Sequence, residues 1–238
     1  MRWNYPVHTF FTPERGKAYT TAQAYSTALT RLEAFYRVSE DDRRPLLVLR
    51  ECEWCNGTDD ALLSNPVGNE RTLIMLRWFH PVKLSLDVLH KDHIFRNLFE
   101  EEHPPHVFLS TWDGKKIIPF PGDASTKEMQ DGLFKLLKSE YKGNATKAVK
   151  ELELLLAQFD MMDERIVRLE RGWENEVEFT GENSRKSKKL KAQLDEEVAH
   201  LAKLRKEETK WSDLKLKKPD AQPIPLVNGV PVSASSKK

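Results

Sequence analysis

The chain has 238 residues, of which 39% are hydrophobic and 32% are charged. One compact core needs about 100 to 150 residues, so this length accommodates one domain and an additional segment. The 38 Lys and Arg residues nearly balance the 37 Asp and Glu residues, which gives a formal net charge of +1. This balance argues against a general attraction to nucleic acid or to membrane surfaces.

Cysteine content and hydropathy exclude further classes of protein. The chain contains 2 cysteines, too few for a scaffold built from disulfides. No apolar run reaches the length of about 18 residues that a membrane span requires. The first residues, MRWNYPVHTFF, have neither the basic nor the apolar region of a secretory signal. We therefore expect a cytoplasmic protein without a membrane partner.

The first part of the chain predicts alternating helices and strands. Apolar residues at helical spacing predict a helix over residues 20–36, with Thr20 or Thr21 as its N-cap. The continuous apolar run at residues 46–49, Leu-Leu-Val-Leu, predicts a central parallel strand buried on both faces. Further along, two helical patterns, a strand, a hairpin and a closing helix are expected at residues 56–63, 70–77, 79–86, 106–120 and 125–137.

The hairpin and the closing helix carry the clearest local signals. The hairpin strands at residues 106–110 and 115–120 flank Asp113-Gly114, a pair typical of tight turns. The closing helix has one apolar face, formed by Met129, Leu133, Leu136 and Leu137. Residues 1–138 thus predict an α/β domain in which a hairpin and a helix complete the sheet.

From residue 139 the composition shifts to Lys, Glu, Leu and Arg, without proline until Pro219. Two apolar stripes with steps of three and four predict two long helices, interrupted at residues 179–184. The stripes are Val149, Leu152, Leu156, Phe159, Met162, Ile166, Leu169, Trp173 and Val177, and then Leu190, Leu194, Val198, Leu201, Leu204 and Trp211. An antiparallel helical hairpin over residues 139–215 is the simplest prediction. The heptad register slips, and a dimeric coiled coil is the alternative. Residues 216–238 lack periodicity and predict a disordered tail.

Cys52 and Cys55 form a Cys-x-x-Cys pair between the predicted strand and the helical pattern that follows it. Disulfide exchange needs two thiols close enough to bond, one of them exposed as a thiolate. Cysteines at positions i and i+3 of a helix start meet both needs, because the free N–H groups and the positive helix end stabilise charge on the first sulfur. Cys52 is therefore the candidate nucleophile and Cys55 the candidate resolving thiol.

Over roughly residues 1–140, the chain resembles the thioredoxin-like superfamily. The resemblance rests on the strand at residues 46–49 that runs into Cys52-Glu53-Trp54-Cys55, and on Pro105 followed by a strand and Asp113-Gly114. It implies a thioredoxin-like sandwich, a central mixed sheet flanked by helices, that needs no bound cofactor. It also implies that Pro105 matches the family's cis-proline, which holds a substrate backbone beside the reactive sulfur. Trp54 and Pro105 are then the candidate substrate-binding residues.

The residues around the first cysteine depart from the family. Glu51 stands where many members have tryptophan, and Glu53-Trp54 replaces a common Gly-Pro. The carboxylates of Glu51 and Glu53 flank Cys52 and oppose its ionisation, whereas the helix end favours it. The direction of the Cys52 pKa therefore depends on tertiary structure.

Two histidines raise a metal-binding alternative. His103 and His106 bracket Pro104-Pro105, and Cys52, Cys55, His103 and His106 would make a Cys2His2 set suited to zinc or copper. The alternative is that both are ordinary exposed loop or edge-strand histidines. Surface, capping or solvated positions are expected for the other candidates, His80, His90, His93, Asp59, Asp60, Asp87 and Asp92.

The sequence favours a thiol-disulfide oxidoreductase that acts on protein disulfides and is served by a thiol-reducing system. The second hypothesis is a non-catalytic thioredoxin-fold adaptor whose helical arm binds a partner or self-associates. A Cys/His metal-binding protein is the third. The lysine-rich run at residues 185–191 is expected to be the solvated face of a helix, so nucleic acid is not an expected partner.

Overall fold

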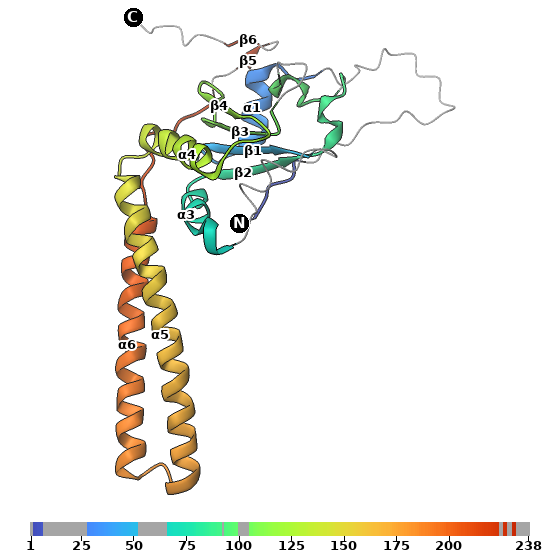
Figure 1. Cartoon of the computed structure of the whole chain (residues 1–238). Coiled ribbons are helices and arrows are strands. Elements are labelled where there is room, and N and C mark those ends of the chain that lie inside the picture. Colours follow the sequence, from blue (N-terminus) through green and yellow to red (C-terminus); the bar gives the residue numbers. More distant parts are fainter. Residues whose placement is uncertain are drawn as a thin grey trace, which may run out of the picture. The chain divides into compact units, whose positions relative to one another are not determined.

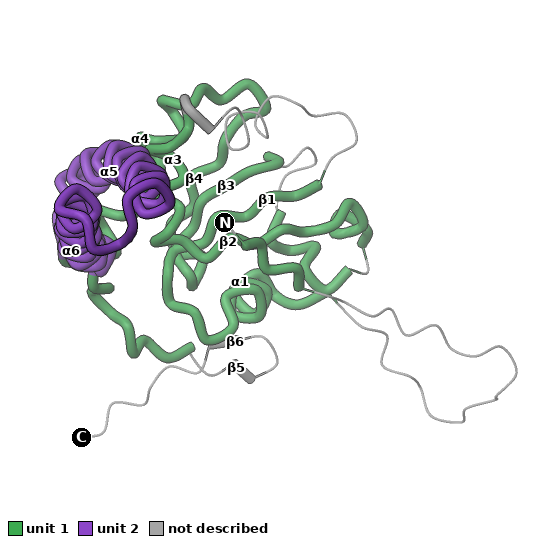
Figure 2. Tube along the Cα trace, turned by 90° about the horizontal axis from the view of Figure 1, so that it is seen from below, with its two compact units in different colours: residues 1–142, 215–238 green, residues 143–214 purple. Residues whose placement is uncertain are grey.

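The computed structural model describes residues 2–6, 28–51, 66–91, 93–99, 105–223, 226–227 and 230–231. The chain forms two units, residues 1–142 with 215–238 and residues 143–214, which Figure 2 distinguishes by colour. Within the described ranges, no helix has the length and apolar character needed to cross a bilayer.

The first unit contains a four-stranded mixed sheet. Its strands β1 (Leu46–Arg50), β2 (His80–Leu84), β3 (Val107–Ser110) and β4 (Ile117–Phe120) lie in the order β2-β1-β3-β4. β1 is parallel to β2 and antiparallel to β3, and β3 is antiparallel to β4. All residues of β1 are buried, as its continuous apolar sequence predicted. The predicted mixed α/β class is therefore confirmed, and the central strand has one parallel and one antiparallel neighbour.

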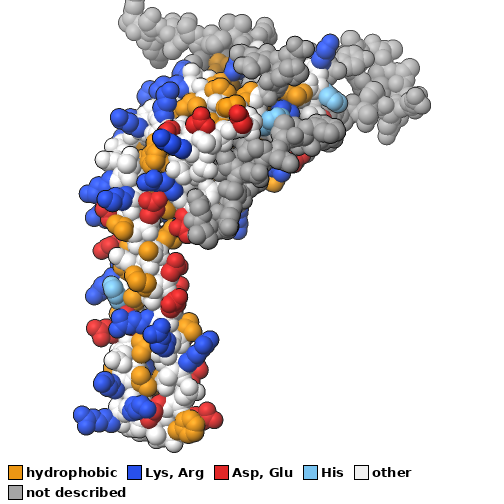
Figure 3. Space-filling view, viewed as in Figure 1, with side chains coloured by type: hydrophobic (Ala, Val, Ile, Leu, Met, Phe, Trp, Pro, Cys, Tyr) orange, Lys and Arg blue, Asp and Glu red, His pale blue; other side chains and the backbone are white. Residues whose placement is uncertain are grey.

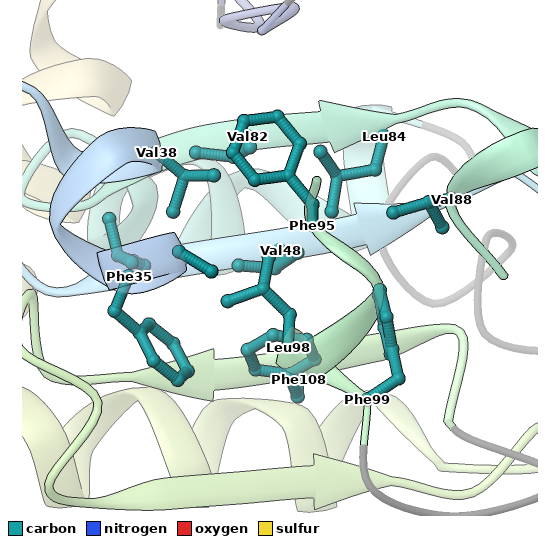
Figure 4. Packing of buried hydrophobic residues seen from close by; sticks show 12 residues of the cluster. Phe35, Val38, Val48, Val82, Leu84, Val88, Phe95, Leu98, Phe99 and Phe108 are labelled. Carbon is teal, nitrogen blue, oxygen red and sulfur yellow. The ribbon is translucent and has the colours of Figure 1, made fainter. Parts of the chain in front are cut away.

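Helices cover both faces of this sheet. α1 (Arg31–Ser39) lies over one face, with the short 3-10 turns η1 (Leu86–Leu89) and η2 (Arg96–Leu98). α3 (Pro66–Leu76) and α4 (Thr126–Glu140) lie on the opposite side (Figure 1). Figure 4 shows the core on the α1 face, formed by Ala34, Phe35, Val38, Leu46, Val48, Val82, Leu84, Val88, Phe95, Leu98, Phe99 and Phe108.

Phe108 of β3 contacts two other aromatic rings of this core. Its ring meets Phe35 edge-on at 6.3 Å between centroids, and it meets Phe99 edge-on at 5.8 Å. Edge-to-face pairs at such distances add to the free energy gained from burial alone. These contacts join α1, the sheet and the segment that follows η2.

α1 begins later than the sequence predicted. Residues 7–27 lie outside the described ranges, but residues 28–30 are not helical, so a single helix over 20–36 is wrong. The reason is a capping box: the Thr30 side chain accepts a hydrogen bond from the Glu33 amide, and the Glu33 carboxylate accepts one from the Thr30 amide at 2.9 Å. A second box, Ser125 with Glu128, starts α4, whose predicted apolar face is buried as expected.

The connection between β3 and β4 is longer than the predicted tight turn at Asp113-Gly114. It spans residues 111–116, within which the Gly114 amide donates to the Thr111 carbonyl at 2.9 Å. Gly114 has φ +70°, and a Cβ there would lie 2.2 Å from the Phe35 ring. Glycine is needed both for the left-handed backbone and for the close approach of α1.

Part of the predicted disordered tail is bound to the first unit. The Lys217 amide donates to the Glu140 carbonyl at 2.8 Å, and its ammonium donates to the carbonyls of Lys138 at 2.9 Å and Ser139 at 2.8 Å. A cation on the last carbonyls of a helix is favourable, and sequence composition gives no sign of it. Two short strands, β5 (Leu226–Val227) and β6 (Val230–Pro231), follow as an antiparallel pair.

The second unit is an antiparallel pair of long helices, α5 (Ala145–Thr180) and α6 (Arg185–Ser212). Asn144 and Ser184 cap their N-termini through side-chain oxygens. Gly181, at φ +81°, ends α5 and starts the turn between them.

The facing residues of α5 and α6 keep an unbroken heptad spacing, so the predicted slip is wrong. Among the buried and half-buried residues, the heptad series are Ala145, Ala148, Leu152, Leu155, Phe159, Met162, Ile166, Leu169, Trp173 and Glu176, and Ser187, Leu190, Leu194, Glu197, Leu201, Leu204, Glu208 and Trp211. Val149 is also buried and Val177 is half-buried, outside this series. Leu156 and Val198, which the apolar pattern placed on the stripes, are 38% and 48% exposed. Glu197 takes the core position instead, and its carboxylate meets Arg165 at 2.7 Å. Because Glu197 is polar, the apolar pattern of the sequence did not reveal that it occupies a core position of α6.

Leu194 and Val198 test this register directly. Leu194→Ala removes a buried side chain and should lower the free energy of unfolding of the helical pair by about 3 kcal/mol. Val198→Ala shortens an exposed side chain and should change it by less than about 0.5 kcal/mol. Scanning calorimetry of the full chain measures both. Equal losses, or a larger loss for Val198→Ala, would contradict the heptad assignment.

Candidate functional site

The described ranges contain only part of the candidate site. Cys52, Trp54, Cys55 and His103 lie outside them. Glu51, Pro105 and His106 lie inside, at the edge of the sheet where β1 ends and β3 begins. The roles expected for the cysteines and for Trp54 therefore stay predictions.

The register between β1 and β3 joins the two halves of the predicted motif. Leu49 is opposite Val107, and the next step continues the ladder, because the Arg50 amide donates to the His106 carbonyl at 2.7 Å. Glu51 follows Arg50, and Pro105 precedes His106, so the residue before the cysteine motif and the proline before the hairpin each lie next to this last paired step.

The carboxyl end of β2 reaches the same edge. The Glu51 amide donates to the Leu84 carbonyl at 2.9 Å, so β1 and β2 end side by side. In open α/β sheets, ligands bind outside the carboxyl ends of parallel strands. This edge is therefore the natural place for a site in the first unit.

Arg50, which is buried, and His106, which is half-buried, form a polar pair at this edge. Arg50 is the last residue of β1 and is only 7% exposed. Its Nη2 atom lies 2.9 Å from Nδ1 of His106, and its guanidinium carbon lies 6.0 Å from the centre of the Phe99 ring. A guanidinium has donors only, so Nδ1 of His106 accepts this hydrogen bond. The neutral ring then carries its proton on Nε2.

Glu51 is paired with a cation from the neighbouring strand. Lys83 of β2 holds its ammonium 2.9 Å from a Glu51 carboxylate oxygen. Because Lys83 offsets the Glu51 charge, this carboxylate opposes ionisation of a neighbouring thiol less than the sequence alone predicts. Sequence analysis missed both Arg50 and Lys83, since neither belongs to the motif and their approach depends on strand pairing.

The metal-binding alternative gains no support from the described residues. Among them, no three His, Cys, Asp or Glu side chains lie together in a way that could hold a metal ion. His106, the one candidate ligand in the described ranges, receives the Arg50 hydrogen bond on Nδ1. A cationic donor on that nitrogen competes with a metal there. The peptide bond before Pro105 involves residue 104, outside the described ranges, so the expected cis isomer stays a prediction.

Two histidines expected on the surface are buried. His93 accepts a hydrogen bond on Nδ1 from the Phe95 amide at 3.1 Å. His80 lies at the start of β2, where Nδ1 is 2.9 Å from the Asp42 carboxylate and Nε2 is 3.2 Å from the Asn4 amide nitrogen. Both ring nitrogens of His80 are therefore engaged within the fold. This arrangement fits a structural role, since a general base needs a nitrogen that can reach substrate.

Asp42 is the centre of this second polar cluster. Burial alone would raise its pKa, but the hydrogen bonds from His80 and Arg44 hold the pKa of Asp42 well below its usual range. The Arg44 guanidinium contacts both carboxylate oxygens, at 3.1 and 2.9 Å from Nε and at 2.6 Å from Nη2. Arg44 also donates to the Arg77 carbonyl at 3.1 Å. The cluster ties the residues before β1 to the start of β2.

A cavity of about 330 Å³ lies at the other end of the sheet, beside the β3–β4 connection. Trp112 forms part of its wall and is contacted by the Tyr36 ring, stacked at 5.4 Å, and by the Arg43 guanidinium at 4.5 Å. Arg43 also donates to the Ala221 carbonyl at 2.7 Å, which fixes the segment after the arm. These contacts identify the cavity as the seam between α1, the sheet and that segment.

No protein-family model matches the chain, and no curated protein or solved structure matches it either. Function is therefore argued from the chain's own residues. The relevant observations are the strand register, the hydrogen bond between Arg50 and His106, and the ion pair of Glu51 and Lys83.

Asp42 gives a pH-dependent stability prediction. Because its pKa is lowered in the folded state, it stabilises the fold above the ordinary aspartate pKa of about 3.9, and this contribution is lost as pH falls below that value. Asp42→Asn should lower the free energy of unfolding by about 2 kcal/mol at pH 7. The difference from wild type should shrink towards pH 3 in scanning calorimetry. The exposed neighbour Asp41→Asn is the control, and an equal effect there would contradict the assignment.

Proposed function

We propose that the chain is a thiol-disulfide oxidoreductase of the thioredoxin-like type, acting in the cytoplasm on protein disulfides through Cys52 and Cys55. The observation that carries the proposal is the β1–β3 register, which brings the residue before the motif and Pro105 to one edge of the sheet. A nucleophilic thiol and a substrate-binding proline need this adjacency. Sequence order alone does not supply it.

The strand order supports the thioredoxin-like fold. The strand that leads to the cysteines is central, and its antiparallel neighbour β3 follows Pro105 and forms a hairpin with β4. Helices on both faces of this mixed sheet agree with the sandwich that the resemblance implies. The six-residue span of 111–116 departs from a tight hairpin turn but keeps the order of the strands.

The proposed reaction is a two-step exchange. The Cys52 thiolate attacks one sulfur of a substrate disulfide, forming a mixed disulfide and releasing the other substrate sulfur as a thiolate. Cys55, as a thiolate, then attacks Cys52 and releases the second substrate sulfur. The substrate gains two electrons, the cysteine pair loses two, and a thiol-reducing system restores the dithiol. Pro105 and Trp54 would position the substrate chain.

Separate replacement of the two cysteines tests the proposal. Wild type should catalyse reduction of insulin disulfides by dithiothreitol, and Cys52→Ser should fall to the uncatalysed rate because the nucleophile is gone. Cys55→Ser should retain attack but trap the mixed disulfide, which intact-mass measurement detects. Full turnover by Cys52→Ser would exclude the proposed role. Wild type at the uncatalysed rate would exclude the reductase activity.

One observation favours an adaptor role through self-association of the arm. Leu154 and Met161 lie seven residues apart on α5, outside the heptad core, and are 52% and 64% exposed. Figure 3 shows hydrophobic side chains on the surface of the helical unit. Leu154 and Met161, one heptad apart, lie on the same face of α5, and exposed apolar residues on one helix face favour packing against another helix.

The oligomeric state tests this second candidate. If the arm joins two copies, analytical ultracentrifugation of the full chain should find a dimer, and Leu154→Gln with Met161→Gln should make it monomeric. Glu164→Gln, on an exposed part of the same helix, should leave the dimer intact. A specific assembly has a dissociation constant below about 100 µM. A wild type that stays monomeric at concentrations up to about 100 µM would therefore rule out this role.

A further inference from the structure

Arg43 carries a positive charge in the wall of the cavity beside the β3–β4 connection, where its side chain is half-buried. Its Nε atom donates to the Ala221 carbonyl at 2.7 Å, and its Nη1 atom donates to the Glu40 carbonyl at 2.8 Å. Its guanidinium carbon lies 4.5 Å from the centre of the Trp112 ring. Within the described ranges, no carboxylate pairs with Arg43 and no acceptor contacts its Nη2 atom. A cation withdrawn from water is normally paired with an anion, and this one has only neutral partners.

The end of α1 offsets only part of this charge. Glu40, whose carbonyl accepts from Arg43, is the residue at the carboxyl end of that helix. A helix end carries about half an elementary charge, whereas a guanidinium always carries a full one. The wall of the cavity therefore keeps a net positive charge at Arg43.

Two lysines add to the positive charge of the cavity lining. Lys116 ends the β3–β4 connection, and Lys218 lies in the segment after the arm. Both are exposed, and the part of the chain that the structure describes offers neither of them a carboxylate partner. Lys115, by contrast, is paired with Asp113 at 2.7 Å. Glu140 is the other carboxylate of the lining, so four cations and two carboxylates leave an excess of two positive charges.

The size and the apolar part of the cavity restrict the ligand further. Its volume of about 330 Å³ is near the lower limit of about 300 Å³ for small-molecule sites. Trp112, Leu216 and Ala221 contribute apolar side chains to the lining. A phosphate monoester carries a charge of about −1.5 to −2 at pH 7 and three acceptor oxygens. This charge matches the excess of two, and the apolar side chains offer a surface for an organic group.

We propose that this cavity binds a small phosphate monoester with an apolar organic group, and that Arg43, Lys116 and Lys218 hold its phosphate. The proposal goes beyond thiol-disulfide exchange, since the cavity lies at the opposite end of the sheet from the carboxyl end of β1 and no cysteine lines it. Binding makes and breaks no covalent bond. Failure of the proposed oxidoreductase activity would leave this binding site intact, and the reverse also holds.

Isothermal titration calorimetry of the full chain with phenyl phosphate tests the proposal. Wild type should bind this ester with a dissociation constant below about 1 mM, and it should bind inorganic phosphate at least about tenfold more weakly, because the apolar contact is missing. Affinity for the ester should fall as the pH is lowered through about 6, where the dianion takes up a proton. Absence of binding at ester concentrations up to about 10 mM, or equal affinity for inorganic phosphate, would overturn the proposal.

Two matched double variants locate the site. Lys116→Met with Lys218→Met should weaken binding of phenyl phosphate about tenfold, because two exposed charges that contact the phosphate are lost. Lys127→Met with Lys135→Met makes the same charge change at exposed positions of α4 outside the lining and should leave the affinity unchanged. Equal effects of the two double variants would contradict the site.

Arg43→Gln tests the half-buried cation separately. It removes the charge but keeps a donor for the Ala221 carbonyl, and it should weaken binding at least about tenfold. Far-ultraviolet circular dichroism verifies that the variant is folded, and unchanged affinity in a folded Arg43→Gln would exclude the proposed role of Arg43.

A phosphorylated protein could present the same chemical group. Free O-phosphoserine and a peptide that contains phosphoserine distinguish the two sources in the same titration. A small-molecule site should bind the peptide no more tightly than the free amino acid. Tighter binding of the peptide would assign the cavity to a protein ligand and overturn the proposal.

Discussion

The antiparallel ladder between β1 and β3 is the constraint on which the rest of the first unit depends. It fixes Leu46 opposite Ser110 and, at its far end, Arg50 opposite His106. A slip of one residue would turn every side chain of β1 to the opposite face, exchanging Leu46 and Val48 of the core with Leu47 and Leu49. Because both faces of β1 are apolar, the α1-face core and the backbone ladder must set the register together. The same register places Pro105, the residue before His106, at the end of the sheet where β1 ends.

Different kinds of contact specify the structures of the two units. The first is specified by non-local strand pairing and by polar anchors such as the Asp42 cluster and the Lys217 contacts with the end of α4. The second is specified by a local heptad repeat in which Glu197 is a core residue paired with Arg165. A buried charge is retained at a cost in stability, and a polar residue at one heptad position can fix helix register. We therefore attribute the alignment of α5 with α6 partly to this pair.

Local sequence signals predicted the elements well and their tertiary partners poorly. The run at residues 46–49 and the apolar face of α4 were predictable, because a short stretch of sequence contains the whole apolar pattern of each. The predicted start of α1 was wrong because apolar residues continue at helical spacing on both sides of Thr30. The sequence does contain the capping box Thr30-x-x-Glu33, which marks the observed start. His80 and His93 were misassigned to the surface, since burial of a histidine depends on partners far away in the chain. Arg50 escaped notice for the same reason: its contact with His106 joins residues 56 apart.

The Glu51 carboxylate illustrates how tertiary structure can weaken an inference from sequence. The sequence places Glu51 and Glu53 next to the thiol, which disfavours a thiolate. In the structure the Glu51 carboxylate is 2.9 Å from the Lys83 ammonium and is 44% exposed, so water and an ion pair both weaken its effect. The Glu51 carboxylate therefore opposes a thiolate in the motif less than its place in the sequence predicts. Its ion pair with Lys83 depends on the pairing of β1 with β2, which joins residues far apart in the chain.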